Sequence, residues 1–349
     1  MPLENEETGK NSVILVFRFS AMGDVAMVAS VLRELVEQRR HLTLVMVSRE
    51  ALQPFFADIS GVVFHPFYPH GPHQGISGLY RLFKELKRYQ PTAVADLHHN
   101  IRSRFLSLLF RLSGIAVRQL DKARKEKKAL TRAYKKIMKP LKPTVERYAD
   151  VFRKLGYPMA LSHTLKRRKQ PLPETAKRLF ADHGGKKVGI APFAKHLPKV
   201  YPFDRMEEVI AYLDRQGHTV LVFGGGTAER QVAAGWQARY SQVHSVVDQF
   251  SLQQELSIIS HLDVMISMDS AGMHMASLMG VRVLSIWGAT HPYAGFLGYG
   301  QVPDDCIQVD HPARPSSIYG NKPCICDGKD SMELIAPVMI IDKLREAGL

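Results

Sequence analysis

Residues 263–287 read DVMISMDSAGMHMASLMGVRVLSIW and contain the clearest secondary-structure pattern of the chain. The apolar runs at its two ends, 263–267 and 281–287, are short and rich in β-branched or large apolar residues, which is typical of buried strands. Between them Asp269 and Ser270 are favourable N-cap residues, and the residues that follow are mostly helix-compatible. The stretch therefore predicts a strand–helix–strand unit of a parallel sheet, with the start of its helix placed to bind an anion.

The same alternation of apolar runs and helical segments recurs along the chain. Strands are expected at 13–19, 42–48 and 93–97 in the first half and at 188–191, 219–223 and 243–247 in the second. Helices are expected at 25–40, 79–89, 174–183, 204–216, 227–240 and 252–260, with a basic helical stretch at 118–155 and a disordered leader at 1–11. The linker Gln170-Pro-Leu-Pro173 joins the two halves. Two successive α/β modules indicate an α/β protein that holds a ligand between its modules.

The positive charge is concentrated near the middle of the 349-residue chain, whose formal net charge is +14. Between Arg118 and Arg147 twelve Lys or Arg residues face three acidic residues. This stretch is either a solvated helical face or a surface for an anionic membrane or a phosphorylated substrate. No aromatic platform or recognition helix supports specific binding of nucleic acid. No apolar run approaches the roughly 20 residues of a membrane span, so a cytoplasmic protein is expected.

Several polar residues follow predicted strands, where a parallel sheet binds its ligands. Gly224 and Gly225 could admit a phosphate or sugar to the backbone or form a tight turn, and Glu229 could complement a helix dipole. Asp24 could cap the first helix or act as a general base. Lys199 could pair with a phosphate or lie in solvent. The fourth group of such residues comprises His98, Asn100 and Arg102 after the strand at 93–97.

A metal site is not expected in this chain. Phe64–Gly78 contains three histidines, but its Pro and Gly residues are typical of an exposed loop. The chain contains no Asp-x-Asp pair of the kind that holds a metal on a diphosphate, so lysine, histidine and helix N-termini would have to neutralise one. Cys324 and Cys326 are too close in sequence for a zinc knuckle and are expected to be structural.

Four motifs occur in a fixed order: Ser20-Ala-Met-Gly-Asp24, Lys199-Val-Tyr-Pro202, Asp269-Ser-Ala-Gly-Met-His274 and Trp287-Gly-Ala-Thr-His-Pro292. With this set the chain resembles the bacterial heptosyltransferase family, glycosyltransferase family 9, over most of its length. The resemblance implies the GT-B architecture, in which two Rossmann-like domains face each other across a cleft and the last helix crosses back to the first domain. It implies an acceptor-binding domain at 1–169, a nucleotide-sugar donor domain at 170–330 and the crossing helix at 331–349.

The family transfers a heptose from ADP-heptose to the lipid-anchored inner core of lipopolysaccharide, with inversion and without a bound metal. The resemblance therefore implies an inverting, cofactor-free glycosyltransferase in which Asp24 is the base and Lys199 neutralises the donor diphosphate. The expected donor-binding residues are Asp269, Ser270, Ala271, Gly272, His274, Glu229, Gly224 and Gly225, and the expected acceptor-binding residues are Gly23, His98, Asn100 and Arg102. The chain departs from the family pattern at Tyr201, where Trp is usual, and at Ala271, where Gly is usual.

Such an enzyme would work at the inner face of the cytoplasmic membrane as a peripheral protein. Two other functions are compatible with the same residues. A nucleotide-sugar epimerase or hydrolase of similar build would consume the donor without an acceptor. A non-catalytic lipopolysaccharide-binding factor would not need a nucleoside diphosphate.

Overall fold

The structure, a computed structural model, describes residues 12–180 and 184–349. The leader expected at 1–11 and the end of the helix expected at 174–183 lie outside these residues. The chain forms two compact units. The first comprises the chain up to Ala21 together with 28–121 and 146–161, and the second comprises 22–27, 122–145 and 162–349. The division of the chain at residues 169 and 330 stays a prediction.

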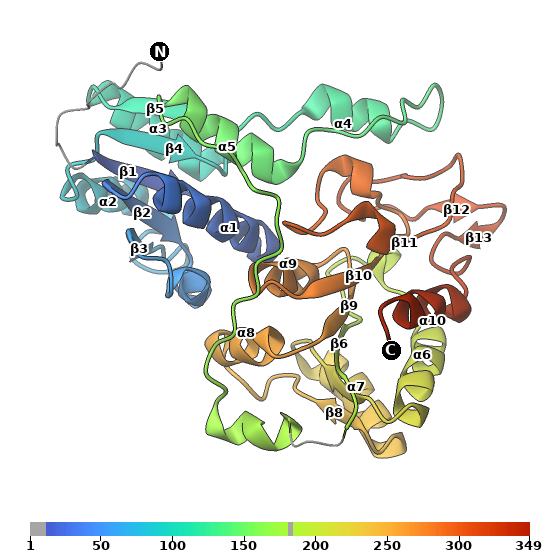
Figure 1. Ribbon diagram of the computed structural model, residues 1–349. Helices are drawn as coiled ribbons and strands as arrows, with labels where there is room; N and C mark the ends of the chain where they lie inside the picture. Colours follow the sequence, from blue (N-terminus) through green and yellow to red (C-terminus); the bar gives the residue numbers. More distant parts are fainter. Residues whose placement is uncertain (1–11, 181–183) are drawn as a thin grey trace, which may run out of the picture. The chain divides into compact units, whose positions relative to one another are not determined.

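The first unit is built on a five-stranded parallel sheet in the order β3-β2-β1-β4-β5 (Figure 1). Its strands are β1 (Ser12–Phe17), β2 (Leu42–Ser48), β3 (Val62–Pro66), β4 (Ala93–Asp96) and β5 (Ala116–Gln119). Its helices are η1 (Glu50–Phe56), α2 (Gly75–Lys87), α3 (Ile101–Leu112), α5 (Thr144–Lys154) and most of α1 (Met22–Gln38). The central strand β1 pairs with β2 on one side and β4 on the other, which explains its almost unbroken apolar run.

The prediction of an exposed loop at residues 64–78 is wrong at both ends of that range. Its first residues belong to β3, an edge strand, where Pro66 costs no central ladder hydrogen bond. Its last residues begin α2. Within it His73 is buried, because its Nδ1 accepts a hydrogen bond from the Tyr68 N–H at 3.1 Å and its Nε2 lies 3.1 Å from Oε2 of Glu85.

The basic stretch at 118–155 is helical only in part. It contains β5, then α4 (Arg124–Leu130), an irregular segment and finally α5. Pro140 and Pro143 lie in the irregular segment, where proline removes N–H donors that a continuous helix would need. Residues 122–145 therefore form a separate excursion that groups with the second unit.

The second unit carries a six-stranded parallel sheet in the order β11-β10-β9-β6-β7-β8. Its strands are β6 (Lys187–Ala191), β7 (Thr219–Val222), β8 (Val243–Ser245), β9 (Val264–Met268), β10 (Arg282–Ile286) and β11 (Cys306–Ile307). Its longer helices are α6 (Phe203–Arg215), α7 (Thr227–Arg239), α8 (Leu252–Ser260), α9 (Ala271–Leu278) and α10 (Pro337–Glu346). The unit also contains four 3₁₀ segments, η2 (Glu174–Phe180), η3 (Leu197–Lys199), η4 (Pro292–Ala294) and η5 (Pro303–Asp305). A hairpin is formed by β12 (Ile325–Cys326) and β13 (Lys329–Asp330).

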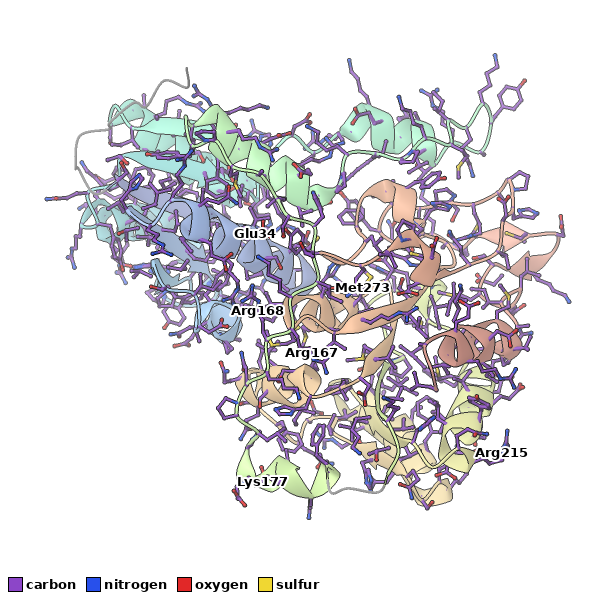
Figure 2. The ribbon with its side chains drawn as sticks, in the orientation of Figure 1. Glu34, Arg167, Arg168, Lys177, Arg215 and Met273 are labelled. Carbon is purple, nitrogen blue, oxygen red and sulfur yellow. The ribbon has the colours of Figure 1, made fainter. Side chains whose placement is uncertain are left out.

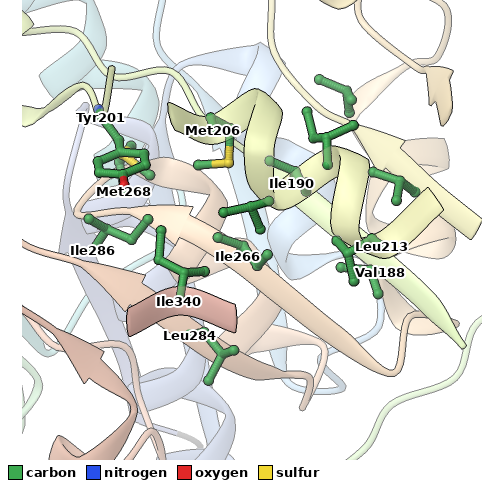
Figure 3. Close-up of a cluster of buried hydrophobic side chains, with 14 of the residues drawn as sticks. Val188, Ile190, Tyr201, Met206, Leu213, Ile266, Met268, Leu284, Ile286 and Ile340 are labelled. Atoms are coloured by element: carbon green, nitrogen blue, oxygen red, sulfur yellow. The ribbon is translucent and has the colours of Figure 1, made fainter. Parts of the chain in front are cut away.

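One core joins the sheet of the second unit to the helices that cover it. Figure 3 shows Ile190 and Ile266 of the sheet with Met206 of α6 and Ile340 of α10. Tyr201 belongs to the same core and donates a hydrogen bond from its hydroxyl to the Ile335 carbonyl at 2.9 Å, while burial raises the pKa of this tyrosine to about 12.

The C-terminal helix, expected to cross back to the first domain, lies in the second unit. There α10 packs beside α6 and β10, as Figure 1 shows, and its Leu344 is completely buried in the second core. The linker that precedes the second sheet also contacts this unit. The Arg168 N–H donates to the Met279 carbonyl at 3.0 Å, and Figure 2 shows Arg167 and Arg168 on this segment near Met273 of α9.

Together the two sheets confirm the predicted fold class, two Rossmann-like modules of mixed α/β type. Within the described part of the chain, no helix combines the length and the apolar character that a membrane crossing requires.

Candidate functional site

The start of α9 is the anion site that the sequence predicts in the second sheet. The stretch 263–287 forms the strand, helix and strand that it predicts, as β9, α9 and β10. Ser270 is the N-cap of α9, but its hydroxyl makes no capping hydrogen bond. The first N–H groups of a helix have no partner within the helix, so those of α9 keep their capacity to bind a ligand at the carboxyl edge of the sheet.

Gly272 allows α9 to lie this close to the sheet. A Cβ atom at Gly272 would come within 2.5 Å of the Ala191 Cβ and 3.1 Å of the Ser267 Oγ. Because both neighbours belong to strands of the sheet, any larger residue would push the helix start outwards. The order Ala271-Gly272 therefore has a structural reason in this chain, which is the contact of α9 with β6 and β9.

Lys199 and Asp269 form an ion pair at the same place. Lys199 ends η3, and its Nζ lies 2.9 Å from Oδ2 of Asp269. Both side chains are shielded, with 15% of Lys199 and 7% of Asp269 exposed. A buried lysine needs an anionic partner, and in this position its ammonium can exchange the carboxylate for a phosphate oxygen.

His274 is buried on α9 and incompletely satisfied. Its Nδ1 has no hydrogen-bond partner among the described residues, an arrangement that costs about 1–3 kcal/mol unless a ligand or water completes it. Burial lowers the pKa of His274, the Asp269 and Asp24 carboxylates oppose this shift, and Lys199 adds to it. The imidazole is therefore neutral at pH 7.

The first turn of α1 belongs to the same compact unit as α9. Gly23 lies against the imidazole, since a Cβ atom there would come within 2.5 Å of the His274 Cδ2. Asp24 is half-buried at the next position, in the first turn of the helix. Five predicted site residues thus lie in one neighbourhood of the second unit: Gly23, Asp24, Lys199, Asp269 and His274.

The glycine-rich turn after β7 is held by two carboxylates. The Gly225 N–H donates to Oε2 of Glu229 at 2.8 Å, and the Gly226 N–H donates to Oδ2 of Asp248 at 2.9 Å. The Arg230 guanidinium donates to Asp248 at 2.7 Å, and this hydrogen bond is the main reason why the pKa of the Asp248 carboxyl is lowered. Glu229 therefore shapes the turn. Contact of Glu229, Gly224 or Gly225 with a donor stays a prediction.

Gly320 covers the stem of Lys199. It has a φ of +75°, and a Cβ atom there would lie 2.2 Å from both Cγ and Cδ of the lysine. The turn around it is fixed by the buried Ser317, whose Oγ accepts hydrogen bonds from the N–H groups of Tyr319, Gly320 and Asn321 at 3.3, 3.0 and 3.2 Å. Sequence reasoning missed this contact, because no motif places Gly320 near Lys199.

The motif from Trp287 to Pro292 follows β10 and is anchored by a buried arginine. Arg314 donates to the carbonyls of Gly288, Trp287 and Thr290 at 2.7, 2.8 and 3.0 Å. Burial, aided by the Arg314 charge, lowers the pKa of His291 to about 4. The hydroxyl of Thr290 is buried and has no partner among the described residues, so it is a second polar group that a ligand could satisfy.

The three predicted acceptor residues after β4 lie in the first unit, and two of them have structural partners. His98 Nδ1 accepts a hydrogen bond from the Phe19 N–H at 3.2 Å. Asn100 caps α3 reciprocally with Ser103. Arg102 is exposed in the first turn of that helix. Their acceptor role stays a prediction.

No cluster of three His, Cys, Asp or Glu side chains suited to a metal ion occurs within residues 12–180 and 184–349. The positive groups at the α9 site are instead Lys199 and the helix N–H groups. Cys324 and Cys326 are buried and reduced, with their sulfur atoms 3.9 Å apart.

Comparison with known proteins gives one family and several similar structures. The family model of glycosyltransferase family 9 (heptosyltransferase) matches residues 79–300. The crystal structure of the glycosyl transferase family 9 from Veillonella parvula DSM 2008 is similar, with a TM-score of 0.75 and 18% identity over 97% of both chains. No curated protein sequence matches the chain.

Two Escherichia coli structures have the same fold. Heptosyltransferase WaaC with ADP has a TM-score of 0.66 and 17% identity over 96% of this chain and 99% of that chain. ADP-heptose lps heptosyltransferase II has a TM-score of 0.67 and 16% identity over 96% of this chain and 98% of that chain. At these identities the likeness shows the fold.

Proposed function

The chain belongs to glycosyltransferase family 9, the heptosyltransferase family, and from this premise we propose that it transfers a heptose from ADP-heptose to the inner core of lipopolysaccharide. The proposal further specifies inversion at the anomeric carbon and no requirement for a metal ion. That the protein is a glycosyltransferase follows from its family.

The observation that carries the proposal is the Lys199–Asp269 pair at the start of α9. Three features meet there within one compact unit: the shielded ammonium of Lys199, the helix N–H groups without a side-chain cap, and the unsatisfied Nδ1 of His274. All three are donors or acceptors that a diphosphate and its sugar can satisfy. The similar Escherichia coli WaaC structure contains ADP, which supports an adenosine diphosphate as the leaving group.

In the proposed reaction an acceptor hydroxyl oxygen attacks the anomeric carbon of the donor. As that bond forms, the Asp24 carboxylate takes the hydroxyl proton, and the bond from the anomeric carbon to the diphosphate oxygen breaks. The electron pair stays on the departing ADP, whose growing negative charge is stabilised by Lys199 and the N–H groups of Ala271 and Gly272. The Ser270 N–H already donates to the Met268 carbonyl at 2.7 Å. Attack opposite to the leaving group inverts the anomeric centre.

Asp269 has a distinct part in this scheme. It holds Lys199 by their 2.9 Å contact and so keeps the ammonium at the helix start. When the diphosphate binds, Lys199 turns to it, and the Asp269 carboxylate becomes an acceptor for a sugar hydroxyl. Neutral His274 contacts the same sugar through the ring nitrogen that has no protein partner.

On the acceptor side we propose that Gly23, His98, Asn100 and Arg102 contact the lipid-anchored oligosaccharide. Arg102 is exposed and can pair with a phosphate of the inner core. Such an acceptor lies in the inner leaflet of the cytoplasmic membrane, so the enzyme would act there as a peripheral protein.

The experiment begins with a panel of ADP, GDP, UDP and CDP measured by isothermal titration calorimetry. ADP should bind, and Lys199→Ala should weaken it. Heptosyl transfer from ADP-heptose to lipopolysaccharide truncated at the inner core is then followed by mass spectrometry, and the anomeric configuration of the product by NMR. Transfer should persist in EDTA.

Three outcomes would contradict the proposal. Preferred binding of another diphosphate would reject the donor. Donor turnover at the same rate without an acceptor would indicate a hydrolase or epimerase. Loss of transfer in EDTA with recovery on adding a divalent metal would reject metal independence.

A further inference from the structure

The segment 131–142, here called the basic loop, is irregular but firmly attached to the second unit. It connects α4 to the segment before α5. Lys136 inserts its ammonium among three backbone carbonyls, those of Pro312, Ala313 and Pro315, at 2.9, 2.7 and 3.1 Å. The Leu141 N–H donates to the Tyr293 carbonyl at 2.9 Å. The loop is therefore held in one conformation without secondary structure of its own.

Three large apolar side chains of the basic loop lie in solvent. Tyr134 is 79% exposed, Ile137 55% and Met138 45%. Ile137 and Met138 directly follow Lys136, so the same anchor that fixes the loop also presents them outwards. A group of exposed apolar side chains on a fixed support indicates an interaction surface.

The cations around these three residues divide into two classes. Lys136 and Lys127 are used within the protein, since the Lys127 Nζ lies 4.6 Å from the ring centroid of Phe296. Arg132, Lys135 and Lys139, by contrast, are exposed and alternate with the apolar residues along the loop. The Lys135 Nζ lies 5.7 Å from the ring centroid of Tyr134, so this contact stays within the exposed surface of the loop. The sequence 122–145 contains a single acidic residue, Glu126. The exposed side of the loop is thus both apolar and cationic.

We infer that the basic loop docks the protein on an anionic lipid bilayer. Tyr134, Ile137 and Met138 enter the boundary between headgroups and acyl chains, and Arg132, Lys135 and Lys139 pair with lipid phosphates. Because Lys136 already fixes the loop, little conformational freedom is lost on docking. The inference rests on the proposed function only in that a lipid-anchored acceptor requires the enzyme to reach a membrane.

The chemistry of the loop favours a bilayer over nucleic acid. Phosphates of either partner would attract the cations, and the exposed ring of Tyr134 could stack on a base, but aliphatic Ile137 and Met138 offer no stacking surface. A bilayer takes up both the charges and the apolar side chains. Nucleic acid would leave Ile137 and Met138 in water.

The test is cosedimentation of the full chain with vesicles of phosphatidylglycerol and phosphatidylethanolamine, compared with phosphatidylcholine alone. One variant combines Tyr134→Ser, Ile137→Ser and Met138→Ser, and the other combines Arg132→Glu, Lys135→Glu and Lys139→Glu. We expect binding to the anionic vesicles only. Each surface cation contributes about fivefold, and reversing its charge adds repulsion, so the charge variant should bind at least about a hundredfold more weakly. The apolar variant should bind at least about tenfold more weakly.

Matched controls lie elsewhere on the same unit. Val338→Ser removes an apolar side chain that is 53% exposed on α10, and Arg215→Glu reverses an exposed charge that Figure 2 shows far from α4. Both should bind vesicles like the unaltered protein. All variants should keep its Tm and its ADP affinity, which shows that they fold.

Equal binding to neutral and anionic vesicles, or full binding by the charge variant, would overturn the inference. A third result would also overturn it: the apolar variant binds vesicles normally, and the charge variant loses binding to both vesicles and duplex DNA. That pattern would indicate a surface that binds anions in general. Vesicle binding is measured without donor or acceptor. Failure of heptosyl transfer would therefore leave this result unchanged, and failure of vesicle binding would leave the transfer reaction untouched.

Discussion

The contact between Gly320 and Lys199 can be tested with a matched pair of substitutions, Gly320→Ala and Gly328→Ala. Both glycines have a positive φ, +75° and +83°, so an alanine is strained by a similar amount at either position, about 1–2 kcal/mol. They differ in what the added Cβ meets. At Gly320 it would lie 2.2 Å from the Lys199 stem, whereas at Gly328 nothing lies within 4 Å.

The expected difference therefore concerns Lys199 alone. A Cβ atom at Gly320 has to displace the lysine stem, which breaks the 2.9 Å pair with Asp269 and moves the ammonium away from the start of α9. A charge-assisted hydrogen bond contributes about 1.5–3 kcal/mol. Loss of about 2 kcal/mol corresponds to a roughly thirtyfold increase in the Kd for ADP. Gly328→Ala should leave that Kd unchanged.

Isothermal titration calorimetry with ADP and thermal unfolding give the two readouts. Both variants should lower Tm, Gly320→Ala by more because it also breaks the Lys199–Asp269 pair, and only Gly320→Ala should lose ADP affinity. In the Lys199→Ala background the Gly320 substitution should have no additional effect on ADP binding, since the side chain through which it acts is gone. If Gly320→Ala binds ADP as tightly as Gly328→Ala, or if its effect persists without Lys199, the positioning role is refuted.

Three further predictions address the base, a buried histidine and the anchor of the basic loop. Asp24→Asn should lower kcat by about 10²–10⁴ with the ADP Kd within a factor of about two, and near-normal turnover would reject the base assignment. The lowered pKa of His291, about 4, makes its contribution to stability complete above its ordinary value of 6.5 and progressively lost as the pH falls towards 4. The variant His291→Asn removes the titrating group, while its amide oxygen can still accept the hydrogen bond from the Tyr293 N–H. Between pH 7 and pH 4 its unfolding free energy should therefore fall by on the order of 2 kcal/mol less than that of the unaltered protein. Parallel curves of unfolding free energy against pH for the two proteins would contradict this. Lys136→Met should lower the unfolding free energy by about 2 kcal/mol and expose the basic loop to trypsin, whereas the same change at Lys135 should do neither.

The sequence predicted the second sheet well because its strands are buried on both faces. Expected ranges overlap five of its six strands. Four of these, β6, β7, β9 and β10, are mainly apolar, whereas β8 contains His244 and Ser245. The first sheet was predicted less completely. Its edge strands β3 and β5 are short, and their residues are only partly buried, so they carry no continuous apolar run. The prediction of a helical stretch over 118–155 was wrong for another reason. The charge pattern of this stretch is typical of a solvated helix, but its prolines interrupt the helix.

In the candidate site, the sequence predicted contacts between residues that are close along the chain and missed contacts between residues that are distant along it. Asp269, Gly272 and the start of α9 could be predicted because strand, cap and helix are adjacent in sequence, and adjacency fixes their geometry. Lys199 lies 70 residues before Asp269, and nothing local tells that its ammonium reaches that carboxylate. Gly320 is even more distant from Lys199 in the sequence. It matters because it has no side chain that would collide with the lysine stem. A glycine in a turn carries no sequence signal that distinguishes steric clearance from backbone strain. The matched pair at Gly320 and Gly328 separates these two causes, which is why it tests the assembled site and not only its motifs.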